Sequence, residues 1–170
     1  MRFKYCPQCG SLLEGRILGD EGEVPWCFRC DRPWFDMFST CVISLVHDNH
    51  DRVLLLHQGY IHARYLNLVS GYMTPGENAQ SAAIREIQEE TGLTVDNIEM
   101  VGTWWFARKD MLMIGFIAGI TDPGELKISS EVDSASWHTA FEAVGLVHPE
   151  GSVSHALTAM FASRFTEKTK

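Results

Sequence analysis

The chain has 170 residues, which is enough for one ordinary domain or for one domain with a small appendage. Its net charge of −8 argues against a nucleic-acid clamp, because such proteins normally carry a basic face. Hydrophobic residues make up 45% and no run of 18 apolar residues occurs, so we expect a globular protein without a membrane span. The surplus of acids fits a site for divalent cations and also fits simple solubility.

Residues 1–36 form a cysteine module. Two C-x2-C motifs, separated by seventeen residues, offer four thiolates in the spacing of a zinc ribbon. The chain start lacks the apolar segment of a signal peptide, so we expect a cytoplasmic protein with reduced thiols, in which paired cysteines indicate metal before disulfide. A four-cysteine site is closed, which favours structural zinc over catalysis. Nucleic-acid binding is the alternative, and the acidic loop 20–23 argues against it. The expected zinc ligands are Cys6, Cys9, Cys27 and Cys30.

After Met37 the chain alternates between apolar, partly β-branched runs and turn-forming segments. Asn78 is a plausible N-cap for a helix that ends at Gly92, and we expect residues 167–170 to fray. Strands interleaved with two or three helices predict a mixed α/β or α+β sandwich behind the small module. The predicted strands are 39–46, 53–56, 65–69, 98–106, 112–121 and 135–137, and the predicted helices are 79–91 and 153–165.

The first helix carries a cluster of carboxylates. Glu86, Glu89 and Glu90 fall at positions i, i+3 and i+4, so their side chains crowd one helix face. Three hard oxygen donors suit Mg²⁺ or Mn²⁺, and such ions suit phosphoryl or pyrophosphoryl chemistry. A bond from Arg85 to Glu77 would fix the preceding loop against the helix. A solvated acidic helix face is the alternative interpretation.

The spacing of the whole segment resembles the Nudix box, G-x5-E-x7-R-E-U-x-E-E-x-G-U, where U is aliphatic. The resemblance implies an α/β/α sandwich with a mixed sheet over residues 37–170, behind a zinc ribbon at 1–36. It also implies hydrolysis of a nucleoside diphosphate linked to another group, with Mg²⁺ or Mn²⁺ held by Glu86, Glu89, Glu90 and the carbonyl of Gly71. The matching residues are Gly71, Glu77, Arg85, Glu86, Ile87, Glu89, Glu90, Gly92 and Leu93.

Many relatives use one further glutamate after the box. Glu131 is our candidate, because it precedes Trp137 in a context similar to the family's E-x5-W pattern. Asp133 is the competing carboxylate, and an ordinary loop residue is the alternative for Glu131. Either Glu89 or Glu131 would act as the general base, and the sequence does not choose between them.

A four-cysteine ribbon ahead of a Nudix domain resembles the NADH pyrophosphatase branch of the family. That branch carries S-Q-P-W-P-F-P-x-S after the box, but residues 103–111 here keep none of its prolines. Their aromatics could stack on a base and Arg108 could meet phosphates, although Trp104 and Phe106 could instead point into the core. The expected substrate-binding residues are Trp104, Trp105, Phe106 and Arg108.

These features predict a Nudix pyrophosphohydrolase that acts on a nucleotide conjugate, with NADH or a related dinucleotide favoured. ADP-ribose, FAD or another nucleotide conjugate is the first alternative. A nucleotide-sensing domain without catalysis is the second, and the complete set of box glutamates argues against it. A nucleic-acid partner is not expected. The resemblance to this branch also implies a homodimer, because relatives in the branch dimerise.

Overall fold

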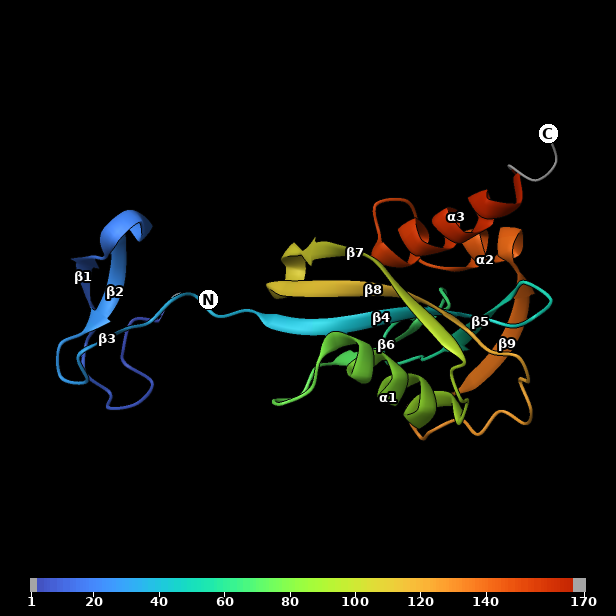
Figure 1. Cartoon of the computed structure of the whole chain (residues 1–170), viewed down its shortest axis with the longest axis horizontal. Helices are drawn as coiled ribbons and strands as arrows, with labels where there is room; N and C mark the ends of the chain where they lie inside the picture. Colours follow the sequence, from blue (N-terminus) through green and yellow to red (C-terminus); the bar gives the residue numbers. More distant parts are fainter. Residues whose placement is uncertain (1–2, 167–170) are drawn as a thin grey trace. The chain divides into compact units, whose positions relative to one another are not determined.

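The computed structural model describes residues 3–166, so the predicted frayed end at 167–170 lies outside the described residues (Figure 1). The chain divides into two compact units, Met1–Ser39 and Thr40–Lys170, and each is described by itself. This boundary falls three residues after the predicted end of the zinc ribbon. Within residues 3–166, every helix is too short or too polar to span a bilayer.

The first unit is a small antiparallel sheet in the order β1-β2-β3. A short 3-10 helix, η1 (Gly19–Glu21), joins the first two strands. Few of its described residues are buried: the apolar ones are Cys6, Val24, Trp26 and Cys27, and two of these four are cysteines. Such a core is too small to stabilise a fold alone, so a cross-link through the thiols is needed. The strands are β1 (Glu14–Ile17), β2 (Glu23–Cys27) and β3 (Arg32–Pro33).

The second unit is built on a six-stranded sheet. Its strand order is β7-β8-β4-β5-β9, with β6 paired to β4 beside this path. In Figure 1, β4 and β8 run in the same direction, whereas the pairs β4–β5, β4–β6, β5–β9 and β7–β8 are antiparallel, so the sheet is mixed. The strands are β4 (Ser39–His47), β5 (Arg52–His57), β6 (Val69–Tyr72), β7 (Asn97–Phe106), β8 (Met111–Gly119) and β9 (Ser134–Thr139).

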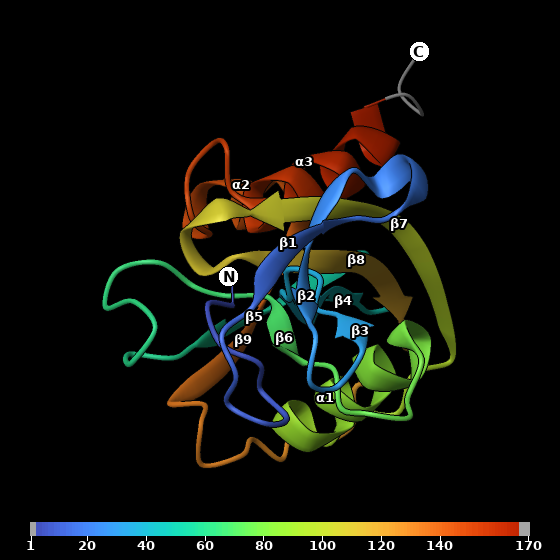
Figure 2. The same ribbon diagram turned by 90° about the vertical axis from the view of Figure 1, so that its left-hand side faces the viewer.

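Helices cover both faces of this sheet, with α1 (Ala79–Thr91) on one side and α2 (Ala140–Leu146) and α3 (Val153–Thr166) on the other (Figures 1 and 2). Successive residues of a strand point to opposite faces. In β4, Leu45 therefore packs with Leu157 of α3, while Val46 packs with Ile87 of α1. The predicted α/β/α sandwich is confirmed.

The boundaries of α1 are those predicted. Asn78 has an extended backbone, and its side chain accepts a hydrogen bond of 2.9 Å from the backbone N–H of Ser81. Gly92 ends the helix in the left-handed region at φ 73°, and its N–H donates to the carbonyl of Gln88. A polar cap at one end and a glycine at the other are local signals, so the sequence alone placed this helix.

Two elements differ from the prediction. The strand expected at 65–69 is wrong in position: only isolated bridges occur at Leu66 and Asn67, and the strand β6 begins at Val69. Pairing with β4 extends this strand through Gly71 and Tyr72, which lie beyond the predicted strand. The helix α2 was not predicted, although its capping box, formed by Thr139 and Glu142, is visible in the sequence.

Candidate active site and metal sites

The four predicted cysteines come together in the first unit. Their sulfur atoms all lie within 4.8 Å of one another, with 3.5 Å between Cys9 and Cys27 and 3.9 Å between Cys6 and Cys30. Four thiolates at ~2.3 Å from one zinc ion would be about 3.8 Å apart at the corners of a tetrahedron. The turn after Cys9 is completed by Gly10 at φ 72°, whose N–H donates to the carbonyl of Cys6 at 2.8 Å.

The thiols of this cluster have pKa values shifted in opposite directions. Hydrogen bonds from the side chain and backbone of Ser11 lower the pKa of the Cys9 thiol to about 6. A hydrogen bond with Cys9, together with burial, raises the pKa of Cys30 to about 12. A soft dication would stabilise all four as thiolates, and sulfur donors in this arrangement suit zinc. The residues present therefore fit a closed, structural zinc site.

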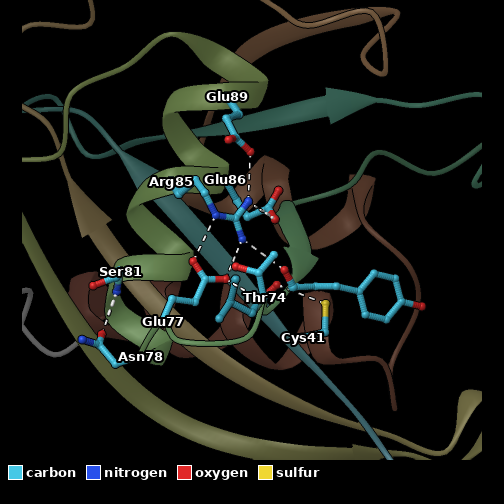
Figure 3. Close-up of polar contacts among 10 residues, drawn as sticks. Cys41, Thr74, Glu77, Asn78, Ser81, Arg85, Glu86 and Glu89 are labelled. Carbon is cyan, nitrogen blue, oxygen red and sulfur yellow. Dashed lines mark hydrogen bonds and ion pairs between the residues drawn. The ribbon is translucent and has the colours of Figure 1, made fainter.

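The second site begins with Arg85 on α1, which contacts three glutamates at once (Figure 3). The predicted pair with Glu77 is present, at 2.8 Å and 3.1 Å, and it lowers the pKa of Glu77 to about 2. The same guanidinium donates to Glu86 at 2.7 Å, to Glu89 at 2.9 Å and to the carbonyl of Tyr72 at 3.1 Å. Arg85 thus binds the loop before α1 to the helix and to the end of β6.

Glu90 lies on the same helix but in a different environment. It is 5% exposed, and its Oε1 accepts a hydrogen bond of 3.2 Å from the side-chain amide of Gln58, at the end of β5. Its Oε2 is buried and has no hydrogen-bond partner among the described residues. Burial, followed by repulsion from Glu86, raises the pKa of Glu90 to about 7. No cationic group is among the causes of this shift, so the ionised form of Glu90 is poorly stabilised.

Gly71 provides the space for the carboxylate of Glu86. A Cβ atom at this position would overlap the carboxylate of Glu86. Gly71 pairs with Val42 in the sheet, so its backbone is held beneath α1. The close approach of a carboxylate to a bare backbone explains why only glycine fits here.

The residues present fit a hard divalent cation. The buried, unpartnered oxygen of Glu90 and the Glu86 carboxylate over Gly71 are oxygen donors of the type that Mg²⁺ and Mn²⁺ prefer. The three box glutamates are not gathered around one point: within residues 3–166, only the cysteine group brings three or more ligand atoms within 4.8 Å of one another. Glu86 and Glu89 are drawn instead to Arg85, as the nearest cation.

The two candidate carboxylates beyond the box have different surroundings. Asp133 accepts a hydrogen bond of 2.7 Å from the N–H of Gly59 and lies 3.2 Å from Nδ1 of His57. Glu131 is exposed, and its charge contributes to the raised pKa of both Glu90 and Tyr60. The charge of Glu131 therefore acts on the box residue Glu90, whereas the carboxylate of Asp133 is engaged by Gly59 and His57.

A β-bulge determines which face of the sheet each aromatic residue of β7 occupies. Before the bulge, Ile98 packs on the α1 side. After the register shift between Met100 and Gly102, Trp104 is half-buried and packs against the α3-side core. Phe106 has the same parity as Trp104, while Trp105 points to the α1 side and is 54% exposed. Arg108 lies exposed in the 3-10 turn η2 (Ala107–Lys109).

Sequence reasoning missed Gln58 and Tyr60. Gln58 is 1% exposed, and its side-chain nitrogen lies 3.2 Å from Glu90 and 3.5 Å from the hydroxyl of Tyr60. A glutamine after an apolar strand carries no distinctive signal, because polar residues commonly follow strands. Only the folded sheet shows that this one is buried beside the box.

Comparison with known proteins agrees with this geometry. The family model for the NUDIX domain matches residues 37–158. The "NAD-capped RNA hydrolase NudC" of Vibrio cholerae is 31% identical over 156 residues, which are 91% of this chain and 56% of that protein. The protein of the same name from Mycobacterium tuberculosis is 38% identical over 112 residues, 64% of this chain and 35% of that protein. This chain therefore spans about half the length of the Vibrio relative.

The solved structure of a NUDIX hydrolase from Nitrosomonas europaea superposes with a TM-score of 0.71. The superposition covers 96% of this chain and 93% of that one, at 19% identity. At that level of identity the likeness supports the fold alone.

Proposed function

The chain belongs to the Nudix family, and from this premise we propose that it hydrolyses the pyrophosphate linkage of nucleoside diphosphate conjugates, with NADH or a related dinucleotide favoured. The observation that carries the proposal is the placement of the box residues. Glu86 lies over Gly71, and a buried oxygen of Glu90 lacks a partner on the same helix. These oxygens are suitable donors for a divalent cation.

Glu86, Glu89, Glu90 and the Gly71 carbonyl would hold Mg²⁺ or Mn²⁺. A bound cation of this kind neutralises phosphate oxygens and makes a water molecule easier to deprotonate. The water oxygen bonds to phosphorus, and the bridging P–O bond breaks with its electron pair on the departing phosphate. The water proton passes to a carboxylate, for which we favour Glu131 and keep Glu89 as the second candidate. Glu131 is favoured because it is exposed and its charge acts on Glu90, whereas Glu89 is held by Arg85.

The substrate class follows from the relatives and from β7. Both reported relatives are named for hydrolysis of an NAD-capped RNA, which contains a dinucleotide. Trp105 is exposed on the face of the sheet that carries α1, where it could stack on a base. Arg108 follows on the adjacent turn and could meet a phosphate, while Phe106 would line the edge of this segment. ADP-ribose and FAD share the same linkage and are the alternative substrates.

A panel of nucleotide conjugates with Mg²⁺ or Mn²⁺ tests this function, with products separated by chromatography. The panel includes NADH, NAD⁺, ADP-ribose, FAD and an RNA that begins with NAD. We expect cleavage of NADH together with at least one other conjugate, because the proline-rich signature is missing. Binding of these compounds without any product would contradict hydrolysis and indicate a nucleotide-sensing domain.

The remaining parts of the proposal concern zinc, assembly and location. We propose that the four-cysteine cluster holds one structural zinc ion, because its sulfur spacing matches a tetrahedral site. A homodimer and a cytoplasmic location stay predictions from the sequence. Sedimentation of the purified protein at several concentrations tests the dimer.

A further inference from the structure

Residues 57–59, at and just after the end of β5, contact Glu90 directly and also contact the loop that carries Glu131. Gln58 bonds to Glu90, while its neighbours His57 and Gly59 hold Asp133, two residues beyond Glu131. We propose that Gln58 and Asp133 are positioning residues, which fix the placement of Glu90 and Glu131 relative to each other through this strand end. The inference rests on the proposed function.

The first contact fixes Glu90. Gln58 is 1% exposed, and its side-chain nitrogen donates to Oε1 of Glu90 at 3.2 Å. With Oε1 engaged, Oε2 is the oxygen that remains for a cation. The backbone of Gln58 is also held, since its carbonyl accepts from Ile61 at 2.8 Å and from His62 at 3.2 Å. A rigid donor therefore sets the rotamer of a metal ligand, as outer-shell partners do in metal sites.

The second contact fixes the loop that carries Glu131. Oδ2 of Asp133 accepts from the N–H of Gly59 at 2.7 Å and lies 3.2 Å from Nδ1 of His57. The backbone N–H of Asp133 donates to the carbonyl of His57 at 2.9 Å. A Cβ on Gly59 would stand 3.1 Å from this same oxygen, so the approach is close. Val132, between the two acids, is 5% exposed and packs in the α1-side core. The loop that carries Glu131 is therefore held at two successive residues, by the hydrogen bonds of Asp133 and by the buried side chain of Val132.

Both anchors are needed because like charges tend to separate. Glu90 and Glu131 lie on different elements, α1 and the loop before β9, and their negative charges repel each other. A displacement of ~1 Å at a reacting centre can lower a rate about 100-fold. Residues 57–59, which end β5 and begin the following turn, hold both elements and oppose this displacement.

The Asp133 contact is tested by a double-mutant cycle with Glu131. We expect Asp133→Ala to lower kcat by ~10-fold in the wild-type background, with KM changed less than twofold, and to have no further effect in Glu131→Gln. Asp133→Asn keeps an oxygen that can accept from Gly59 and should recover most of kcat. The amide proton of Gly59, followed by NMR, should lose its hydrogen-bonded shift in Asp133→Ala only.

Asp122→Ala is the matched control. Asp122 makes the same kind of bond, at 2.9 Å, to the N–H of Gly124 in the loop after β8. We expect its removal to leave kcat within twofold of wild type. An equal loss from Asp133→Ala in both Glu131 backgrounds, or no loss in either, would overturn the positioning role.

The Gln58 contact is tested by metal affinity, without substrate. Gln58→Met preserves size but removes the donor, and we expect Mn²⁺ binding, measured by electron paramagnetic resonance, to weaken ~10-fold. Ser44→Ala is the control, because Ser44 is 1% exposed in the same sheet and its hydroxyl lacks a partner among the described residues. Unchanged Mn²⁺ affinity in Gln58→Met would reject this half of the inference.

The two levels of the argument fail differently. If wild-type protein binds no Mn²⁺, or if Glu131→Gln keeps full kcat, the proposed function is wrong in its metal site or in its base. If the wild type binds Mn²⁺ and Glu131→Gln loses kcat, but Asp133→Ala and Gln58→Met behave like their controls, the function stands and the positioning role is lost.

Discussion

The site contains one carboxylate, Glu90, that is buried and has a raised pKa. Glu90 is 5% exposed, with one oxygen on Gln58 and the other without a partner among the described residues. Burial and the charge of Glu86 raise its pKa from 4.5 to about 7. When this buried carboxylate is ionised, it lowers the stability of the metal-free protein. A bound cation would remove this cost, because its positive charge stabilises the ionised form.

This pKa shift gives a pH-dependent stability. Between pH 4.5 and about 7 the folded protein binds a proton that the unfolded chain releases, so the free energy of unfolding falls as pH rises through this window. The full cost above pH 7 is about 3 kcal/mol at most. Metal-free Glu90→Gln should therefore melt higher than wild type at pH 8, and the two should converge near pH 5. Calorimetry without divalent cations measures this difference.

Added Mn²⁺ should reverse the order. It should raise the melting temperature of wild type at pH 8 and have little effect on Glu90→Gln, whose activity should be almost absent. A Glu90→Gln variant with near wild-type turnover would show that this residue does not bind the catalytic metal.

Gly71 offers a second test at the scale of one residue. Gly71→Ala adds one methyl group where the carboxylate of Glu86 now lies. Because Gly71 is half-buried in a strand, the side chain of Glu86 must move away rather than the backbone. We expect a loss of at least ~10-fold in Mn²⁺ affinity, comparable to Glu86→Gln, with circular dichroism unchanged. Wild-type metal binding by Gly71→Ala would contradict the placement of Glu86 over this glycine.

At the scale of elements, the bulge in β7 decides which aromatic can meet a substrate. Strict alternation from Ile98 would place Trp104 and Phe106 on the α1 side. The register shift between Met100 and Gly102 exchanges the faces, so Trp104 packs against the α3-side core and Trp105 is exposed. The shift depends on pairing with β8, which a reading of β7 alone does not contain.

Two substitutions in β7 should therefore have opposite effects. Trp104→Ala should lower the free energy of unfolding by about 3 kcal/mol and leave KM nearly unchanged, because it empties part of the core. Trp105→Ala should leave stability nearly unchanged and raise KM for a dinucleotide about tenfold, through lost stacking. Urea denaturation and steady-state kinetics on both variants measure the two quantities. The reverse pattern would show that Trp104 faces the substrate.

Helix ends were predictable where their signals are local. Asn78 and Gly92 defined α1 in the sequence, because a cap bonds within three or four residues of itself. The strand β6 was misplaced because its pairing partner, Cys41 to Ser44, is distant in the sequence. Propensity alone favoured the apolar stretch before it, and tertiary pairing overrode that preference.

At the scale of the whole molecule, the two units are stabilised by different means. All three apolar clusters of the second unit consist of residues from β4 onwards, whereas the first unit buries few apolar side chains among its described residues. The first unit therefore depends on its thiol cluster, and its folding free energy should be the free energy of zinc binding.

Zinc removal should separate these contributions. We expect one zinc per chain by metal analysis, and a strong chelator should unfold residues 3–39 while the NMR signals of the α1-side and α3-side cores persist. Cys30→Ser should have the same effect at sub-stoichiometric zinc. A protein without zinc that keeps the β1–β2 amide signals, or a disulfide among the four cysteines, would contradict the structural zinc site.

The sequence by itself determined the features that depend on spacing along the chain. The two cysteine pairs, the extent of α1 and the positions of Glu86, Glu89 and Glu90 on one helix follow from intervals of three or four residues and from local caps. Only the tertiary structure decided three further features. These are the burial of Glu90 against Gln58, the hydrogen bond from the N–H of Gly59 to Asp133, and the face of the sheet on which Trp105 lies. These depend on contacts between residues from 32 to 74 positions apart, or on a strand register, and neither is encoded in a local pattern.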